Sequence, residues 1–170
     1  LDVMGPQGNG FDLSGLDIED TALIIGGGIG VPPLLQVTKE LHSKGVKVTS
    51  VLGFATKAAV ILEEEMKKYG RVIVTTDDGS YGIKGFSVSV LPELFAEEQV
   101  DEACICGPGI MMKTAAQMAA DAGIYCEVSM ERRMGCGTGT CLACVCDKVD
   151  GGHYKVCLDG PVFNAQEVCL

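Results

Sequence analysis

The stretch that decides the fold reads ALIIGGGIGVPP and covers residues 22–33. It joins a short apolar strand to a glycine-rich loop, and the loop opens a helix because proline suits a first helical turn. Apolar residues then recur with helical spacing until Gly45, which predicts the end of the helix. A strand, a glycine loop and a helix in this order direct backbone N–H groups and the positive helix end toward a phosphate. The spacing differs from the usual dinucleotide pattern, so a tight turn that needs small residues only for packing is the competing interpretation.

The same alternation of strand and helix continues along the chain. Further strands are expected at residues 46–54, 72–75, 103–106 and 124–128, and helices at residues 56–68, 86–98 and 110–121. Pro92 could interrupt the amphipathic segment at residues 86–98. Repeated β-α units with right-handed crossovers predict the α/β class, with an open, parallel, five-stranded Rossmann-like sheet and helices on both faces.

Ligands of such sheets bind beyond the carboxyl ends of the strands. The loops expected there cover residues 26–30, 53–56, 76–85 and 106–109. Two adjacent carboxylates, Asp77 and Asp78, lie in the longest of these loops. They could be metal ligands, but carboxylates beside a glycine are more often turn formers.

A second pattern, CGTGTCLAC at residues 136–144, is followed by a fourth cysteine at Cys157. The spacing C-x4-C-x2-C with a distant fourth cysteine is typical of a loop that wraps a [2Fe-2S] cluster and is closed by a neighbouring strand. Soft thiolates stabilise iron-sulfur centres. The interleaved glycines would let backbone N–H groups approach the sulfur atoms.

Two other interpretations compete for these cysteines. Structural zinc sites usually present two C-x2-4-C knuckles, whereas here three cysteines share one loop. A disulfide framework is weaker, because nine is an odd count and no signal peptide precedes them. The remainder of the chain suits an intracellular protein, and we expect it in the cytoplasm.

The turn Asp150-Gly151-Gly152 joins two β-rich runs, residues 145–149 and 153–157, and predicts a hairpin that brings Cys157 back beside the loop. We therefore expect three parts. They are a tail or linker at residues 1–20, a nucleotide-binding domain at residues 21–128 and a small cluster module at residues 129–170.

Composition narrows the class of function. The chain has 170 residues, 47% hydrophobic content and a formal net charge of −10. It is long enough to bury a core, and no apolar run approaches the roughly 20 residues that span a bilayer. The acidic balance, with only 13 Lys and Arg, argues against nucleic acid as a partner.

Taken together, the motifs resemble a known family. The ordered set comprises Gly26–Gly30, Thr76–Ser80, Cys106–Pro108 and the four cysteines that precede Asp159–Phe163. It resembles the electron-transfer subunits of dihydroorotate dehydrogenase B, within the ferredoxin-NADP reductase superfamily. The resemblance covers almost the whole chain.

The resemblance implies an oxidoreductase that uses NAD, FAD and a [2Fe-2S] cluster. In that family an N-terminal β-barrel binds FAD, and residues 5–11 look like its last loop, so FAD would be held largely by a barrel that is missing here. The implied partner is a flavin-bearing catalytic subunit, dihydroorotate dehydrogenase of pyrimidine biosynthesis, in a heterotetramer. Electrons would pass from substrate to the partner's FMN, then to the cluster, to FAD and to NAD.

Roles carry over where residues match. The resemblance places NAD against Gly27, Gly28, Ile29 and Gly30, with Gly107 and Pro108 near the nicotinamide and flavin. It makes Cys106 the catalytic candidate beside the reacting ring. It assigns the cluster to Cys136, Cys141, Cys144 and Cys157. The other four cysteines, Cys104, Cys126, Cys146 and Cys169, match no role and are expected to be buried free thiols. Lys57 is one cation where the 2′-phosphate of NADP would need more, which favours NAD.

Two rivals remain. The small subunit of an NADH-dependent ferredoxin:NADP oxidoreductase shares the architecture, but it tends to replace one cluster cysteine with aspartate. A non-catalytic, zinc-bearing nucleotide sensor would bind a nucleotide and move no electrons.

Overall fold

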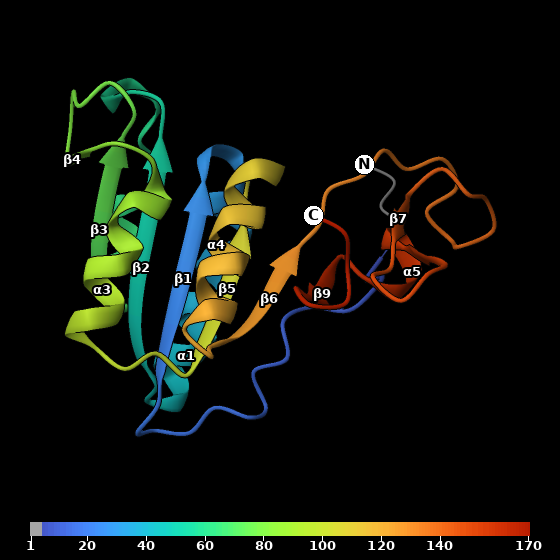
Figure 1. The fold of residues 1–170 in the computed structure, drawn as a ribbon, viewed down its shortest axis with the longest axis horizontal. Helices are drawn as coiled ribbons and strands as arrows, with labels where there is room; N and C mark the ends of the chain where they lie inside the picture. The colour runs from blue at the N-terminus through green and yellow to red at the C-terminus, as the bar shows by residue number, and fades with distance from the viewer. Residues whose placement is uncertain (1–4) are drawn as a thin grey trace.

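The structure is a computed structural model that describes residues 5–170, so the first four residues of the predicted tail lie outside it. Seven strands form one sheet in the order β4-β3-β2-β1-β5-β6-β9, and a separate hairpin pairs β7 with β8 (Figure 1). The strands of the large sheet are β1 (Thr21–Gly27), β2 (Lys47–Phe54), β3 (Arg71–Thr76), β4 (Ile83–Lys84), β5 (Glu102–Cys106), β6 (Tyr125–Ser129) and β9 (Val162–Asn164).

The five predicted strands are confirmed as the parallel strands β1, β2, β3, β5 and β6. β1 is central, and all seven of its residues are buried, as expected of a strand covered on both faces. The sheet has two strands more than predicted. β4 adds two residues in parallel to β3, and β9 returns antiparallel to β6.

Three of the predicted helices are confirmed: α1 (Val31–Lys44), α3 (Leu91–Glu97) and α4 (Gly109–Asp121). Pro92 occupies the first turn of α3, where its missing N–H is tolerated, and does not interrupt the helix. A short 3-10 turn, η3 (Ser87–Val90), precedes α3.

The predicted helix at residues 56–68 is wrong. It is replaced by a 3-10 turn, η2 (Lys57–Ala59), and a single turn of helix, α2 (Glu63–Met66). Between them Leu62 has a φ of 60°. A left-handed residue cannot continue an α-helix, so the chain breaks there.

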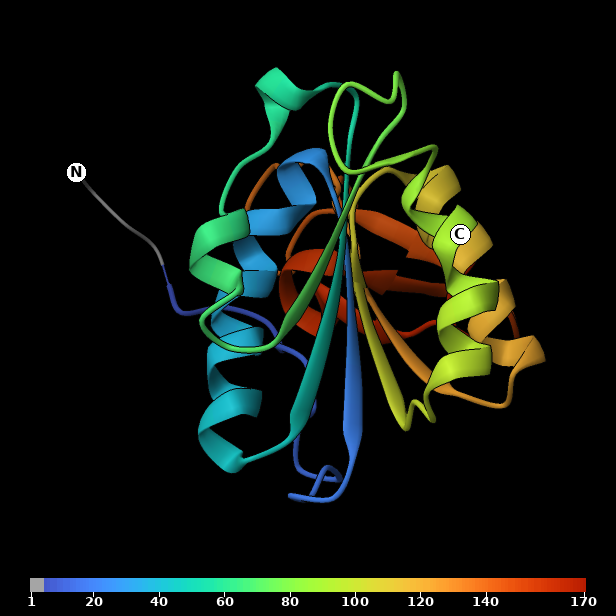
Figure 2. The ribbon, with the colours of Figure 1, turned by 90° about the vertical axis from the view of Figure 1, so that its left-hand side faces the viewer.

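Helices cover both faces of the sheet and enclose two apolar cores (Figure 2). On one face, α1 and α2 pack Leu34, Leu41 and Met66 against β1 and β2. On the other face, α3 and α4 pack Leu91 and Ala115, among others, against the same strands and β5. The loops at the carboxyl ends of the strands are left open.

The cysteine-rich C-terminal part lies beside β6 (Figure 1). It contains the predicted hairpin, formed by β7 (Val145–Asp147) and β8 (His153–Lys155). Cys157 differs from expectation, because it lies in a helical turn, α5 (Val156–Asp159), and not in a strand. β9 follows and joins the large sheet, so this part shares main-chain hydrogen bonds with the nucleotide-binding part.

The segment before β1 runs along the edge of the molecule from the cysteine-rich part to the start of β1 (Figure 1). We call residues 9–20 the strap. At its beginning, the N–H of Asn9 donates to the carbonyl oxygen of Gly160 at 2.6 Å. Leu13 and Leu16 are buried in the core, so the strap is packed although it has no helix or strand of its own. Among residues 5–170, no helix has the length and apolarity to cross a membrane.

Candidate functional site

A cavity of about 480 Å³ opens at the carboxyl ends of β1, β2, β3 and β5. Its walls are largely apolar, with Phe54, Phe86 and Met111 among the lining residues. Gly27, Gly28 and Pro108 also line it, so the structure brings the two predicted loops, residues 26–30 and 106–109, to one place. A mostly apolar cleft with a few convergent polar groups is the usual form of a cofactor site.

Most glycines of these loops are required by packing. A Cβ atom on Gly30 would lie 2.3 Å from the carbonyl oxygen of Cys106, and one on Gly27 would lie 2.6 Å from the Met111 sulfur. A Cβ on Gly107 would lie 3.0 Å from the backbone of Gly27. The two loops therefore touch backbone to backbone, which supports the packing interpretation at these positions.

Gly28 is different. It has a φ of 53°, and a Cβ placed on it would meet no protein atom within 4 Å. The position needs glycine for its left-handed backbone, and the space above it belongs to the cavity. Since no protein atom fills the space next to Gly28, a phosphate group could bind there.

The donors for such an anion come from the turn η1 (Gly28–Gly30), which leads into α1. Neither η1 nor α1 has a side-chain cap at its beginning. Pro32 and Pro33 have no N–H, so the backbone N–H groups of Gly28, Ile29 and Gly30 are the ones left to bind a phosphate at the positive helix end. The Ile29 side chain projects outward and is 80% exposed.

The charges at the rim disfavour an additional phosphate group such as the 2′-phosphate of NADP. Asp77 lines the cavity, and no lysine or arginine is among its lining residues. Lys57 Nζ lies 5.4 Å from the centre of the Tyr81 ring, so this cation is held against an aromatic face. Asp78 serves as a turn former: its Oδ1 accepts hydrogen bonds from the Ser80 N–H at 2.9 Å and the Ser80 hydroxyl at 2.6 Å.

Cys106 ends β5 and is half-buried. It faces Gly26 of β1 on one side and Ser129 of β6 on the other. Burial raises the pKa of the Cys106 thiol, so the group is a neutral thiol at neutral pH. It lies next to the cavity-lining loop, but it is not itself among the lining residues.

The four predicted cluster ligands lie in the loop before β7 and in α5, and all are free thiols. Gly137 and Gly139 have φ values of 71° and 76°, so the loop turns through left-handed positions. These turns direct N–H groups at sulfur. The N–H groups of Cys141 and Thr138 donate to Cys136 Sγ at 3.3 Å and 3.4 Å.

Those contacts favour thiolates. Backbone N–H groups of Cys141 and Thr138 lower the pKa of Cys136 to about 5. The backbone N–H of Cys157 lowers the pKa of Cys144. A hydrogen bond to Cys144 raises the pKa of the Cys157 thiol. Across residues 5–170 no three His, Cys, Asp or Glu side chains gather as a ready site for a single metal ion.

The donor set fits an iron-sulfur cluster. N–H groups that point at thiolates are the contacts that stabilise such a centre and set its potential. Lys155 Nζ donates to the carbonyl oxygen of Gly139 at 2.5 Å and ties the hairpin to the loop. This part of the chain also carries three exposed apolar side chains, Met134, Leu142 and Leu158.

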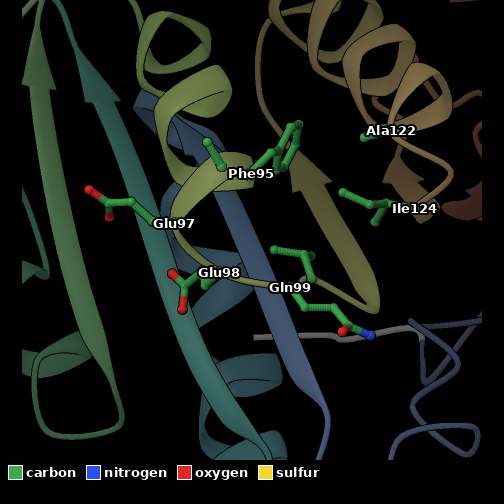
Figure 3. A pocket seen from close by; sticks show the side chains of 8 residues that line it. Phe95, Glu97, Glu98, Gln99, Ala122 and Ile124 are labelled. Carbon is green, nitrogen blue, oxygen red and sulfur yellow. The ribbon is translucent and has the colours of Figure 1, made fainter.

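A second cavity, of about 380 Å³, lies at the opposite end of the sheet between the ends of α3 and α4 (Figure 3). Figure 3 shows Glu97 and Glu98 directed away from Phe95 and Ile124. Glu98 accepts hydrogen bonds from Lys47 at 2.5 Å and Thr49 at 3.0 Å. Burial opposes its ionisation, but these bonds outweigh burial and lower its pKa. Its polar groups are already paired, so we assign this cavity no ligand.

Sequence reasoning missed three features of the site. The contact between Gly30 and Cys106, the sheet pairing of Ser129 with Val162, and the cation–aromatic contact of Lys57 all join residues far apart in the chain. Nothing in the local sequence signals them.

Two family models match the chain. The oxidoreductase NAD-binding domain matches residues 24–117, and the iron-sulfur cluster binding domain of dihydroorotate dehydrogenase B matches residues 131–169. Among solved structures, an NADH-dependent reduced ferredoxin-NADP oxidoreductase has a TM-score of 0.87 and 35% identity, over 99% of this chain and 60% of that one.

Curated relatives are closer in sequence. The electron transfer subunit of dihydroorotate dehydrogenase B (NAD(+)) from Streptococcus pneumoniae serotype 4 is 54% identical over 172 residues, and that from Bacillus pumilus is 48% identical over 172 residues. Both alignments cover all of this chain, which spans 68% and 65% of the length of the two relatives. The chain therefore belongs to the family of electron transfer subunits of NAD-dependent dihydroorotate dehydrogenase B.

Proposed function

We propose that this chain carries the NAD-binding and cluster-binding parts of a cytoplasmic electron-transfer subunit, which exchanges electrons between NAD and a flavin-bearing dihydroorotate dehydrogenase in a heterotetramer. The observation that supports the proposal is that one sheet carries the chain segments next to both candidate sites. Gly26 of β1 pairs with Cys106 of β5, Cys106 pairs with Ser129 of β6, and Ser129 pairs with Val162 of β9. A cytoplasmic location suits nine free thiols.

When bound, NAD exchanges a hydride, a [2Fe-2S] cluster exchanges single electrons, and a flavin can do both. The residues of this chain bind NAD and the cluster and orient them. We assign the NAD phosphates to the N–H groups of Gly28, Ile29 and Gly30, and the base and sugar to the apolar walls of the cavity. We assign no residue of this chain to FAD.

In this proposal Gly27, Gly107 and Pro108 shape the floor on which the nicotinamide ring rests. Cys106 supplies a neutral thiol beside that floor. Because its proton stays in place at neutral pH, the thiol is a weak nucleophile, and we assign it a position next to the loop that lines the cavity.

Cys136, Cys141, Cys144 and Cys157 are proposed to hold the cluster. The exposed apolar side chains of Met134, Leu142 and Leu158 would then lie on the face that meets the partner subunit. An apolar rim beside a redox centre excludes water and lets a partner approach closely. The curated relatives favour dihydroorotate dehydrogenase as the partner, since their identity of about 50% exceeds the 35% of the ferredoxin-NADP oxidoreductase.

The test is Cys141→Ser in the assembled complex, with Cys169→Ser as the matched control. Cys169 is exposed, so the expectation that it is buried is wrong, and it stands outside the proposed ligand set. We expect Cys141→Ser to lose dihydroorotate-driven NAD reduction and to keep NADH oxidation by an artificial acceptor, while Cys169→Ser keeps both. Full dihydroorotate-driven reduction by Cys141→Ser, with its partner still bound, would overturn the proposal.

A further inference from the structure

Two buried carboxyl groups, Glu102 and Glu127, lie under the strap, and neither belongs to the two proposed sites. Glu102 begins β5, at the opposite end of that strand from Cys106, and is 5% exposed. Glu127 lies in β6 and is 6% exposed. Glu102 is in register with Tyr125, so Glu102 and Glu127 lie on the same face of neighbouring strands, one diagonal step apart.

The strap is bound directly to this pair. The N–H of Asp12 donates to Glu127 Oε2 at 2.9 Å, and the Tyr125 hydroxyl donates to Glu127 Oε1 at 3.3 Å. On either side of that contact, Phe11 packs against the core and Leu13 is buried in it. A buried carboxylate, that of Glu127, therefore helps to hold the strap in place.

The pair has no cation of its own among the described residues. Glu98, a half-buried acid, shows the contrast, because it forms ion pairs with Lys47 and Arg71. Within residues 5–170, the cation that acts on Glu102 is Lys44, whose Nζ already donates to the carbonyl oxygen of Leu13 at 2.5 Å. The titratable and charged groups that face the pair are Asp12 of the strap, Lys44 of α1, Cys104 of β5 and Tyr125 of β6.

This environment opposes two negative charges. Burial, and then the charge of Glu127, raise the pKa of Glu102 to about 7. Burial also raises the pKa of Glu127, against the hydrogen bond from Asp12. The pair therefore holds one proton below about pH 7 and loses it above that pH, and we place this proton on Glu102.

We propose that Glu102 and Glu127 form a proton-dependent clasp that holds the strap against the sheet. With one proton on the pair, Glu127 keeps its bond to Asp12. Loss of that proton to solvent leaves two adjacent buried carboxylates, whose repulsion and hydration loosen the strap. The strap runs from Gly160, next to the cysteine-rich part, to β1, which ends in the glycine loop. The clasp thus makes the relative positions of the two sites depend on pH. The clasp itself does not depend on the proposed function; only its effect on the two sites does.

Hydrogen exchange of the strap amides tests the clasp in the 170-residue chain. Protection is compared at about pH 5.5 and about pH 8.5, after correction for the intrinsic effect of pH on exchange. We expect the Asp12 amide to lose about tenfold or more in protection at the higher pH, since each pKa unit corresponds to a factor of ten. Glu102→Gln stays neutral and should keep the protection at both values.

Glu98→Gln is the matched control, because it neutralises a half-buried acid that has cation partners. It should leave the pH dependence of the strap as in the unmodified chain. Equal protection at both pH values, or a loss of protection that persists in Glu102→Gln, would overturn the clasp. Should Glu102→Gln fail to fold, the carboxyl carbon of Glu102 can be titrated by NMR in the unmodified chain. A midpoint at the ordinary glutamate value would also overturn it. None of these results depends on NAD binding, so they are separate from the test of the proposed function.

Discussion

Replacing Gly28 with valine probes the nucleotide loop most selectively. Gly28 has a φ of 53°, and the position of its missing Cβ faces open cavity. Valine therefore meets two separate penalties. A left-handed backbone costs an L-residue about 1–2 kcal/mol of folding stability. The new side chain also occupies the space that we assign to a phosphate.

The binding penalty follows from the lost contacts. A hydrogen bond to a charged group contributes about 1.5–3 kcal/mol, so losing one corresponds to about 10- to 150-fold weaker NADH binding. Gly123→Val provides the control. Gly123 has a φ of 73° and also faces open space, but it follows α4 at the far end of the sheet. It should have a similar folding penalty and unchanged NADH affinity.

The assay is a fluorescence titration of NADH against both variants, with thermal unfolding measured in parallel. We expect comparable losses of stability and a loss of affinity in Gly28→Val alone. Equal NADH affinity in Gly28→Val and the unmodified chain would refute the assignment of the loop to the phosphates. Equal weakening in both variants would show that strain, and not steric exclusion, explains the effect.

Three further predictions address the remaining groups. Asp77→Ser should raise the affinity for NADPH relative to NADH by about tenfold, because it removes a carboxylate from the cavity rim; an unchanged ratio in competition titrations would argue against this role. Cys106→Ala, in the full-length subunit with its flavin, should slow flavin reduction by NADH about tenfold at nearly constant KM; an unaltered stopped-flow rate would make Cys106 a structural residue. The free energy of unfolding should fall by about 3 kcal/mol as pH rises from 4.5 to about 7, because the folded chain keeps a proton on Glu102 that the unfolded chain releases. It can be measured by urea titration at each pH, and the same dependence of this free energy on pH in Glu102→Gln would contradict the prediction.

The parallel strands and three helices could be predicted because their signals are local. The apolar run before Gly26 forms β1, and the residues with helical spacing after the glycine loop form α1. The helix expected at residues 56–68 failed, because nothing in the sequence signals the left-handed conformation of Leu62. β4 and β9 were missed for another reason: each has two or three residues and exists only through pairing with a distant strand.

The candidate site shows the same division. Glycine and cysteine spacing pointed to the loops that line the cavity and surround the thiols. It could not separate Gly30, which packs against Cys106, from Gly28, which faces open space, because that difference arises from tertiary contacts. Nor could it show that Glu102 and Glu127 are buried together, since charged residues are exposed by default.

The most direct test of the account is the content of the cysteine site. We propose that the chain, produced and purified without oxygen, be analysed for iron, acid-labile sulfide and zinc, and that its visible and EPR spectra be recorded before and after reduction. The account predicts iron and sulfide in the proportion of one [2Fe-2S] cluster per chain, with a reducible reddish-brown chromophore that Cys141→Ser lacks and Cys169→Ser keeps. A colourless protein with one zinc ion per chain would contradict it.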